Sequence, residues 1–204
     1  MRRLRVVTLI SLTIGLAVNL SGMGTWAAFT SSTSSLANSF TSGTVILSDD
    51  DGGSTAMFTV ALGVMTPNVT VSRCIAVTYT GSLPANVVLF RGSGAIGGTG
   101  LETDLNLKVT RGTGATFPTC TGFTADATNY LGAGAGVIFN TATITTYPLE
   151  AGTPIQDPPG TAEVWTNTET HVYKFDVTVK STAPDTQQGK VANAIDFSWK
   201  ATNT

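Results

Sequence analysis

The fold class follows from one stretch, His171-Val172-Tyr173-Lys174-Phe175-Asp176-Val177-Thr178-Val179, in which apolar and polar side chains alternate. Successive side chains of a β-strand point to opposite faces of a sheet, so this alternation predicts a strand with one apolar and one solvated face. Such strands are typical of antiparallel sheets, because parallel sheets are usually covered on both faces.

Shorter runs of the same kind extend in both directions from this stretch. They cover residues 44–47, 57–64, 69–79, 86–90, 105–109, 137–139, 143–145 and 192–199. Turn sequences such as Asp49-Asp50-Asp51-Gly52-Gly53 separate them, and residues 112–136, with six glycines, are interpreted as a long loop. Many short strands without a helical pattern between them predict an all-β fold: a jelly-roll-like antiparallel β-sandwich with long glycine-rich loops.

The composition supports this class and excludes others. Threonine accounts for 36 of the 204 residues, and only 12% of residues are charged. Threonine is β-branched and suits a pleated sheet better than a helix, which argues against a helical bundle. Abundant apolar residues and a net charge of -2 argue against disorder. With 11 basic residues against 13 acidic ones, and no basic cluster beyond Arg5, nucleic-acid binding is not expected.

The N-terminus has the pattern of a secretory signal peptide, residues 1–28. Residues 1–5 are basic, residues 6–18 are apolar and uncharged, and small residues lead to Ala27-Ala28-Phe29, where cleavage is expected. A permanent membrane anchor is the alternative, but this run is shorter than the roughly 20 residues that a spanning helix needs. Cleavage leaves 8 basic residues against 13 acidic ones, a net charge of -5, and no transmembrane anchor is expected in the mature chain.

The two cysteines, Cys74 and Cys120, are expected to form a disulfide. An even number of cysteines in an exported protein is typical of disulfide bonding, and this bond would close a loop of 45 intervening residues. Two buried free thiols are the alternative, because cysteine is also a good small apolar residue.

The chain lacks the patterns of common catalytic sites. His171 is the only histidine, whereas the common zinc proteases need two histidines one helical turn apart. A Ser-His-Asp triad remains open, but no nucleophile-elbow glycine pattern accompanies it, so we interpret His171 as a surface strand residue. We therefore expect no enzyme activity, no catalytic residue and no metal ligand.

Two further patterns can each be interpreted either as an ordinary structural feature or as a binding site. Asp49-Asp50-Asp51-Gly52 is similar to the start of a calcium loop, but Thr59-Val60-Ala61 replaces the later bidentate acid, so a turn is favoured. No cofactor is expected, and weak surface calcium binding stays open. Alternation favours the core for five aromatic residues, with an exposed carbohydrate platform as the alternative: Trp165, Tyr173, Phe175, Phe197 and Trp199.

Three parts of the chain resemble one family. They are Gly24-Thr25-Trp26-Ala27-Ala28-Phe29 followed by 38–47; Val64-Met65-Thr66-Pro67 followed by 73–79 and 81–85; and 173–179 followed by 187–189 and 195–201. Together they resemble the TasA and camelysin-like proteins, in which a SipW-type signal peptidase cuts the leader. Residues 91–160 match nothing in that family, and Pro67-Asn68 stands where the family has Pro-Gly.

This resemblance implies a jelly-roll subunit of a bacterium that is secreted and assembles with itself into extracellular or biofilm matrix fibres at the cell surface. The SipW-type signal peptidase would be its partner during export. Two alternatives remain: a secreted camelysin-type metallopeptidase, since some family members carry that label, and a carbohydrate-binding or adhesive surface module. The single histidine argues against the peptidase.

Residues 29–43 are expected to form an N-terminal assembly segment before the sandwich domain, residues 44–204. Residues 29–42 are rich in Ser and Thr, carry no charge, and place Phe29, Leu36 and Phe40 too far apart to build a strand pair alone. A segment of this kind can complete the sheet edge of another subunit by donor-strand exchange, with its apolar side chains setting the register. A disordered terminus is the alternative.

Overall fold

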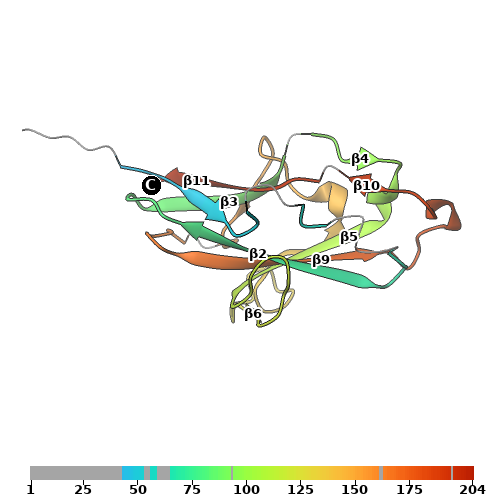
Figure 1. The fold of residues 1–204 in the computed structure, drawn as a ribbon, viewed down its shortest axis with the longest axis horizontal. Helices are drawn as coiled ribbons and strands as arrows, with labels where there is room; N and C mark the ends of the chain where they lie inside the picture. The colour runs from blue at the N-terminus through green and yellow to red at the C-terminus, as the bar shows by residue number, and fades with distance from the viewer. Residues whose placement is uncertain (1–42, 53–55, 59–64, 93, 161–162, 194) are drawn as a thin grey trace, which may run out of the picture. The chain divides into compact units, whose positions relative to one another are not determined.

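A computed structural model describes residues 43–52, 56–58, 65–92, 94–160, 163–193 and 195–204. These residues form antiparallel β-sheets, and their only helical elements are short 3-10 turns (Figure 1): η2 (Leu101–Asp104), η3 (Ile144–Thr146) and η4 (Asp185–Gln187). The predicted all-β, antiparallel fold is confirmed. Within this part of the chain no helix has the length and apolar character needed to cross a membrane.

The larger sheet contains six strands, with the stretch that predicted the fold at its centre. Its order is β1-β2-β9-β5-β6, and β7 also pairs with β5. The bounds are β1 (Leu47–Asp49), β2 (Thr70–Tyr79), β5 (Leu105–Thr113), β6 (Thr124–Ala125), β7 (Val137–Thr143) and β9 (Thr170–Val179). In the register of the three long strands, Val177 of β9 lies between Val71 of β2 and Leu107 of β5.

A smaller sheet has the order β11-β3-β8, and a two-stranded ladder, β10-β4, continues two of its strands. The bounds are β3 (Ala85–Arg91), β4 (Gly97–Gly98), β8 (Ile155–Gln156), β10 (Ala192–Asn193) and β11 (Phe197–Asn203). The predicted run 192–199 is therefore two strands. Gly98 lets the backbones approach here, since its φ is 125° and a Cβ would lie 2.2 Å from the carbonyl oxygen of Val191.

The two sheets pack face to face around one apolar core. The inner face of the larger sheet contributes residues such as Val77, Leu107 and Phe175, and β3 contributes Val87 and Leu89, all of them buried. The five aromatic residues singled out in the sequence belong to this core: Trp165, Tyr173 and Phe175 are fully buried, and Phe197 and Trp199 pack against it. Their positions favour the core interpretation over an exposed platform.

The long glycine-rich loop is fastened to the outer face of the larger sheet. The predicted disulfide joins Cys120 of this loop to Cys74 of β2, with the two Cα atoms 5.1 Å apart. Cys74 is buried there with Ala115 and Val172, in a small apolar cluster separate from the main core. The loop therefore covers an apolar patch on a face that is otherwise polar.

Several predicted elements differ in extent from the sequence analysis. β5 continues beyond the run 105–109 to Thr113, and β7 continues beyond the run 137–139 to Thr143. Residues 112–136, interpreted as a loop, contain the end of β5 and the short strand β6. The run 44–47 contributes only its last residue to β1, which then continues to Asp49. The run 143–145 is mostly the 3-10 turn η3, because Ile144 turns away from the sheet and is buried in the core. Residues 59–64 of the run 57–64 lie outside the described residues.

Candidate functional site

The first candidate site is a groove between an edge of each sheet, which we call the edge groove. It has a volume of about 270 Å³ and combines apolar and small polar side chains. Its lining residues come from β1, β2 and β11: Leu47, Ser48, Asp49, Val77, Phe197, Ser198 and Trp199. The groove exists because β1 and β11 contact one another across the two sheets without pairing.

The β11 side of the edge groove is open. β11 pairs with β3 along its whole length on one side, and no described strand pairs with its other side. An unpaired strand edge presents a row of N–H and C=O groups that can template pairing with another chain. The buried indole N–H of Trp199 also has no acceptor among the described residues.

Backbone hydrogen bonds from neighbouring segments partly cover the edge of the larger sheet beside the groove. β1 pairs only with Val77–Tyr79 of β2. Beyond β1, the Asp50 N–H donates to the carbonyl of Ala76 at 3.2 Å, and the Cys74 N–H donates to the carbonyl of Pro118 at 3.4 Å. β1 is itself an edge strand whose other side has no strand partner among the described residues, but it is only three residues long, whereas β11 offers an unpaired edge of seven residues.

Most of the site residues expected from the sequence lie outside the described residues. These are the cleavage-site residues Ala27 and Ala28, Phe29, which belongs to both sets, and the apolar positions Leu36 and Phe40 of the assembly segment. The expected assembly strand thus remains a prediction, while the groove that could receive it is described.

A second candidate site surrounds Arg111, at one end of the larger sheet. Its side chain is only 4% exposed and contacts three carboxylates. The shortest N–O distances are 2.6 Å to Asp126, 3.1 Å to Asp157 and 2.5 Å to Glu163. Since β5 alternates inward at Leu105, Leu107 and Val109, the next inward position is Arg111, so its charge enters the layer between the sheets.

Polar side chains extend this network, which we call the Arg111 cluster. The Tyr173 hydroxyl donates to Asp157 at 2.6 Å, and the Tyr130 hydroxyl donates to Asp126 at 2.9 Å. His171 places Nε2 2.8 Å from an Arg111 nitrogen and 2.9 Å from Glu169 Oε1. The His171 side chain is 12% exposed, so its interpretation as a surface strand residue is wrong.

Burial and charge pairing set the protonation of the Arg111 cluster. Burial lowers the pKa of Arg111, but Asp157, Asp126 and Glu163 raise that pKa by more, so the guanidinium stays charged. Burial raises the pKa of Asp157, and the charge of Arg111 and the hydroxyl of Tyr173 oppose the rise. Burial also raises the pKa of Tyr173, which therefore stays a neutral donor.

Sequence reasoning missed the Arg111 cluster because its members come from segments far apart in the chain. No spacing rule connects Arg111 with Asp157 or Glu163. One feature could have found it: Arg111 continues the apolar face of the run 105–109, and a charge on such a face needs buried partners.

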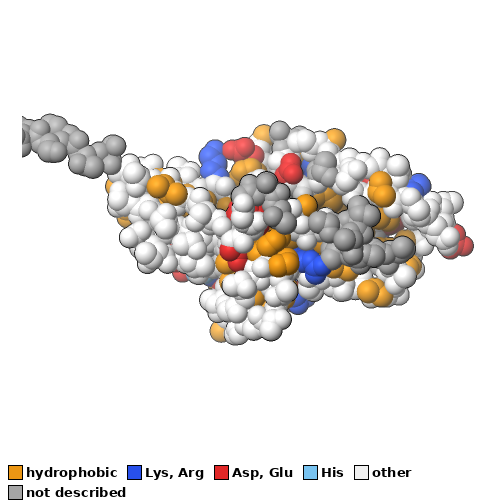
Figure 2. Space-filling model, viewed as in Figure 1, with side chains coloured by type: hydrophobic (Ala, Val, Ile, Leu, Met, Phe, Trp, Pro, Cys, Tyr) orange, Lys and Arg blue, Asp and Glu red, His pale blue; other side chains and the backbone are white. Residues whose placement is uncertain are grey.

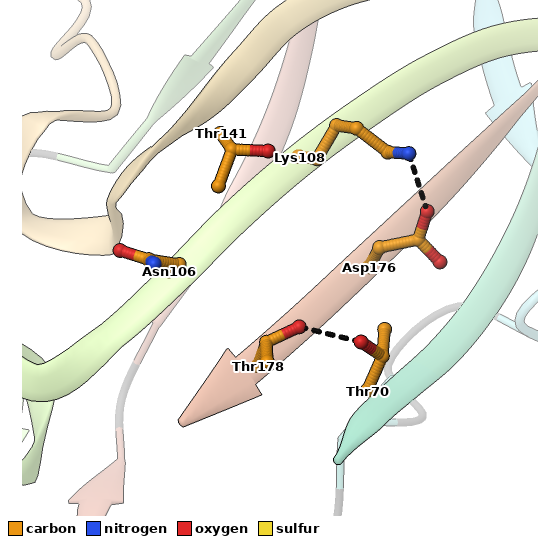
Figure 3. A pocket seen from close by; sticks show the side chains of 6 residues that line it. All are labelled: Thr70, Asn106, Lys108, Thr141, Asp176 and Thr178. Carbon is orange, nitrogen blue, oxygen red and sulfur yellow. Dashed lines mark hydrogen bonds and ion pairs between the residues drawn. The ribbon is translucent and has the colours of Figure 1, made fainter. Parts of the chain in front are cut away.

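A shallow polar depression on the outer face of the larger sheet is the third candidate (Figure 3). It measures about 160 Å³ and is lined by Thr70, Asn106, Lys108, Thr141, Asp176 and Thr178. Lys108 lies 3.6 Å from Asp176, and the hydroxyls of Thr70 and Thr178 lie 2.7 Å apart. These pairs satisfy one another across neighbouring strands, which is how polar sheet faces are stabilised.

The turn with three aspartates has a structural role. Asp50 Oδ1 accepts the backbone N–H of Ala76, and Asp50 Oδ2 accepts that of Phe117, both at 2.8 Å. Both carboxylate oxygens therefore already serve as hydrogen-bond acceptors, which favours the turn interpretation of this sequence over a calcium loop.

Two comparisons were made at the level of sequence. No protein-family model matches this chain, and no curated protein sequence matches it. The fold and its sites define the class: a disulfide-bonded, all-β protein with antiparallel sheets, an unpaired strand edge and a buried charge cluster.

Charged side chains are few and scattered on the face drawn in Figure 2, where the described residues form no basic patch.

Proposed function

We propose that this protein is a secreted structural subunit that polymerises into extracellular or biofilm matrix fibres, with its jelly-roll-like domain receiving the N-terminal segment of a neighbouring copy. The observation that supports this proposal most strongly is the unpaired edge of β11 beside the edge groove. A strand added there would obtain main-chain hydrogen bonds from β11 and place alternate side chains against the groove.

The dimensions of the groove and the segment are compatible. Seven residues of β11 span about 23 Å at the rise of an antiparallel strand. Residues 29–42 are twice that number, so they could cover the whole edge and still leave a connection to residue 43. Leu36 and Phe40 are four residues apart, so in an added strand they would lie on the same face and offer apolar side chains to Leu47, Phe197 and Trp199, whereas Phe29 would point to the opposite face.

Donation of the N-terminal segment from one subunit to the next would also explain how an open-ended filament grows. If each subunit gives its N-terminal segment to the next, donor and acceptor surfaces differ, and such heterologous contacts form filaments unless the ring closes. The export pattern and the low charge of the chain suit an extracellular polymer.

Electron microscopy of the mature protein, starting at Phe29, tests the proposal. We expect fibres from this protein and folded monomers from a variant that lacks residues 29–42. Fibres of unchanged length and yield from the deletion variant would eliminate the donor-strand mode. N-terminal sequencing of secreted protein checks the expected start at Ala28 or Phe29.

Matched substitutions separate the groove from general effects on solubility. Ser198→Arg places a bulky charge in the edge groove, whereas Ser181→Arg adds the same charge at an exposed turn away from it. In the segment, Phe40→Asp removes an apolar anchor, and Ser39→Asp adds the same charge next to it. We expect weaker polymerisation only from Ser198→Arg and Phe40→Asp, with all four variants folded by circular dichroism.

A further inference from the structure

Asp49 is the only charged residue among the described residues that line the edge groove. It lies directly opposite Val77 in the pairing of β1 with β2, and opposite residues of an antiparallel pair project to the same face of the sheet. Both therefore face Phe197 and Trp199 across the groove. Asp49 is exposed in the isolated subunit. A strand added beside β11 would occupy the groove and remove water from the Asp49 carboxylate.

The turn that carries Asp49 supplies no cation to this carboxylate. Its other titratable residues are Asp50 and Asp51, which are also acidic. The Asp50 carboxylate accepts backbone hydrogen bonds from Ala76 and Phe117 with one oxygen each. The local charge at this end of the groove is therefore negative.

The neighbouring strands leave this negative charge uncompensated. The basic residue of β2 is Arg73, four positions before Val77, and its guanidinium donates to a backbone carbonyl of its own strand at 2.9 Å. On β11, Lys200 follows the groove-lining residues and pairs with Glu150 at 2.8 Å. Asp196, just before β11, is acidic. None of these groups forms a printed ion pair with Asp49 among the described residues.

The segment expected to enter the groove brings no cation either. Residues 29–42 carry no charge, and the sequence of residues 52–72, which follows the aspartate turn, is also uncharged. A strand added from a neighbouring copy would therefore cover a carboxylate without a partner of opposite charge. Burial of an unpaired charge is so costly that the group takes up a proton instead.

The isolated subunit already shows the direction of this effect. Partial burial raises the pKa of Asp49 above its ordinary 3.8, and the side chain of Asp51 and the charge of Asp50 raise it further, against the Asp51 N–H, which lowers it. Removal of the remaining water raises the pKa again, because desolvation disfavours the charged form. The assembled state then binds a proton that the free subunit lacks, so assembly strengthens as the pH falls.

We propose that Asp49 makes strand addition at the edge groove dependent on acid: the neutral carboxyl admits the N-terminal segment of a neighbouring copy, and the carboxylate opposes it. This inference rests on the proposed function and adds its regulation. A neutral carboxyl can also donate a hydrogen bond to a carbonyl or hydroxyl of the Ser- and Thr-rich segment. The dependence operates between the pKa of the free subunit and the higher pKa in the fibre, and it levels off below the former.

The critical concentration for fibre formation tests this dependence. It is measured by sedimentation of the mature protein, starting at Phe29, between neutral pH and about pH 5. A chelator in every buffer prevents metal ions from neutralising the aspartates. We expect the critical concentration to fall with the pH, by at most about tenfold per pH unit, which is the limit for one proton per subunit.

Three variants assign the effect to Asp49. Asp49→Asn is neutral at every pH and should polymerise at neutral pH as readily as the wild type does in acid, with a flat pH profile. Asp49→Glu keeps a titrating carboxyl and should retain the pH dependence. Asp185→Asn, in the exposed turn η4, removes the same charge away from the groove and should follow the wild type. Because the mature chain has more acidic than basic residues, this control separates the groove from general charge repulsion.

The outcomes distinguish this inference from the proposed function. Fibres of the wild type whose critical concentration does not change with pH, or an equal pH dependence in Asp49→Asn, would overturn the role of Asp49 and leave the fibre proposal intact. Absence of fibres from all four proteins at every pH, with each folded by circular dichroism, would overturn both.

Discussion

At the scale of single residues, one buried cation joins segments from across the chain. Arg111 connects β5 to the segment after β6 through Asp126, to the residue after β8 through Asp157, and to the segment before Trp165 through Glu163. None of these segments is held to its neighbours by long strand pairing. The guanidinium, with its planar set of donors, therefore takes the place of a ladder of backbone hydrogen bonds.

Replacing Arg111 should be severely destabilising. Arg111→Met leaves the fully buried Asp157 and the mostly buried Asp126 without their cation, and breaking a buried pair in this way costs about 3–5 kcal/mol. The control is Lys108→Met, because Lys108 is 40% exposed on the outer face and such pairs contribute about 1 kcal/mol or less. Urea unfolding measures both, and equal losses would show that the Arg111 cluster is not a structural centre.

A second residue-scale prediction concerns acid. Burial raises the pKa of Glu169, but the hydrogen bonds with His171 and Thr166 lower it by more, so the net value is below the ordinary 4.5. A carboxyl whose pKa is lowered on folding contributes stability above the unfolded value and loses that contribution as the pH falls through the folded value. We expect the free energy of unfolding to decrease below about pH 4.5, and less steeply in Glu169→Gln. Parallel curves for the two proteins would contradict this assignment.

At the scale of elements, side-chain contacts at the turn after β1 hold the edge of the larger sheet. Asp50 accepts backbone hydrogen bonds from β2 and from the glycine-rich loop, with one carboxylate oxygen for each. This turn thereby fixes β1, the outer edge of β2 and the disulfide-bonded loop relative to one another.

Removing the two hydrogen bonds that Asp50 accepts should destabilise this edge of the larger sheet locally without unfolding the protein. Asp50→Ala is expected to lower stability by about 1–2 kcal/mol, since two hydrogen bonds to an exposed carboxylate are lost. Amide hydrogen exchange at Ala76 and Phe117 should accelerate more than exchange at Phe175 in the central strand. Asp185→Ala, in the exposed turn η4, is the control and should change neither amide. Uniform acceleration at all three amides would instead indicate global destabilisation.

The elements that the sequence predicted well are those whose pattern is local. The alternation over 171–179 became β9, and the runs 69–79 and 105–109 became β2 and β5, because period-two alternation needs only a sheet with one buried face. The turn at Ile144 and the division of 192–199 depend on where distant segments pack. The Arg111 cluster was missed for the same reason, as no local pattern relates Glu163 to Asp126.

At the scale of the whole molecule, the disulfide is the principal covalent constraint. It joins residues 46 positions apart and encloses β3, β4 and β5 within one covalent loop. The double variant Cys74→Ser/Cys120→Ser should lose about 2–5 kcal/mol, chiefly because its unfolded chain has more freedom. Chemical denaturation of oxidised and reduced wild-type protein should differ by a similar amount. If the two have equal stability, the bond does not constrain the unfolded ensemble.

The position of the disulfide has a mechanical consequence for any polymer made of these subunits. Tension that enters near β1 and leaves near β11 must cross the chain between residues 47 and 203, but the bond carries the load directly from Cys74 to Cys120. The bypassed segment cannot extend, and it would otherwise lengthen by about 150 Å at roughly 3.4 Å per residue. Single-molecule pulling should show this difference in extension between reduced and oxidised subunits. Under load, a fibre of disulfide-bonded subunits would therefore lengthen in shorter steps, and by less in total, than a fibre of reduced subunits.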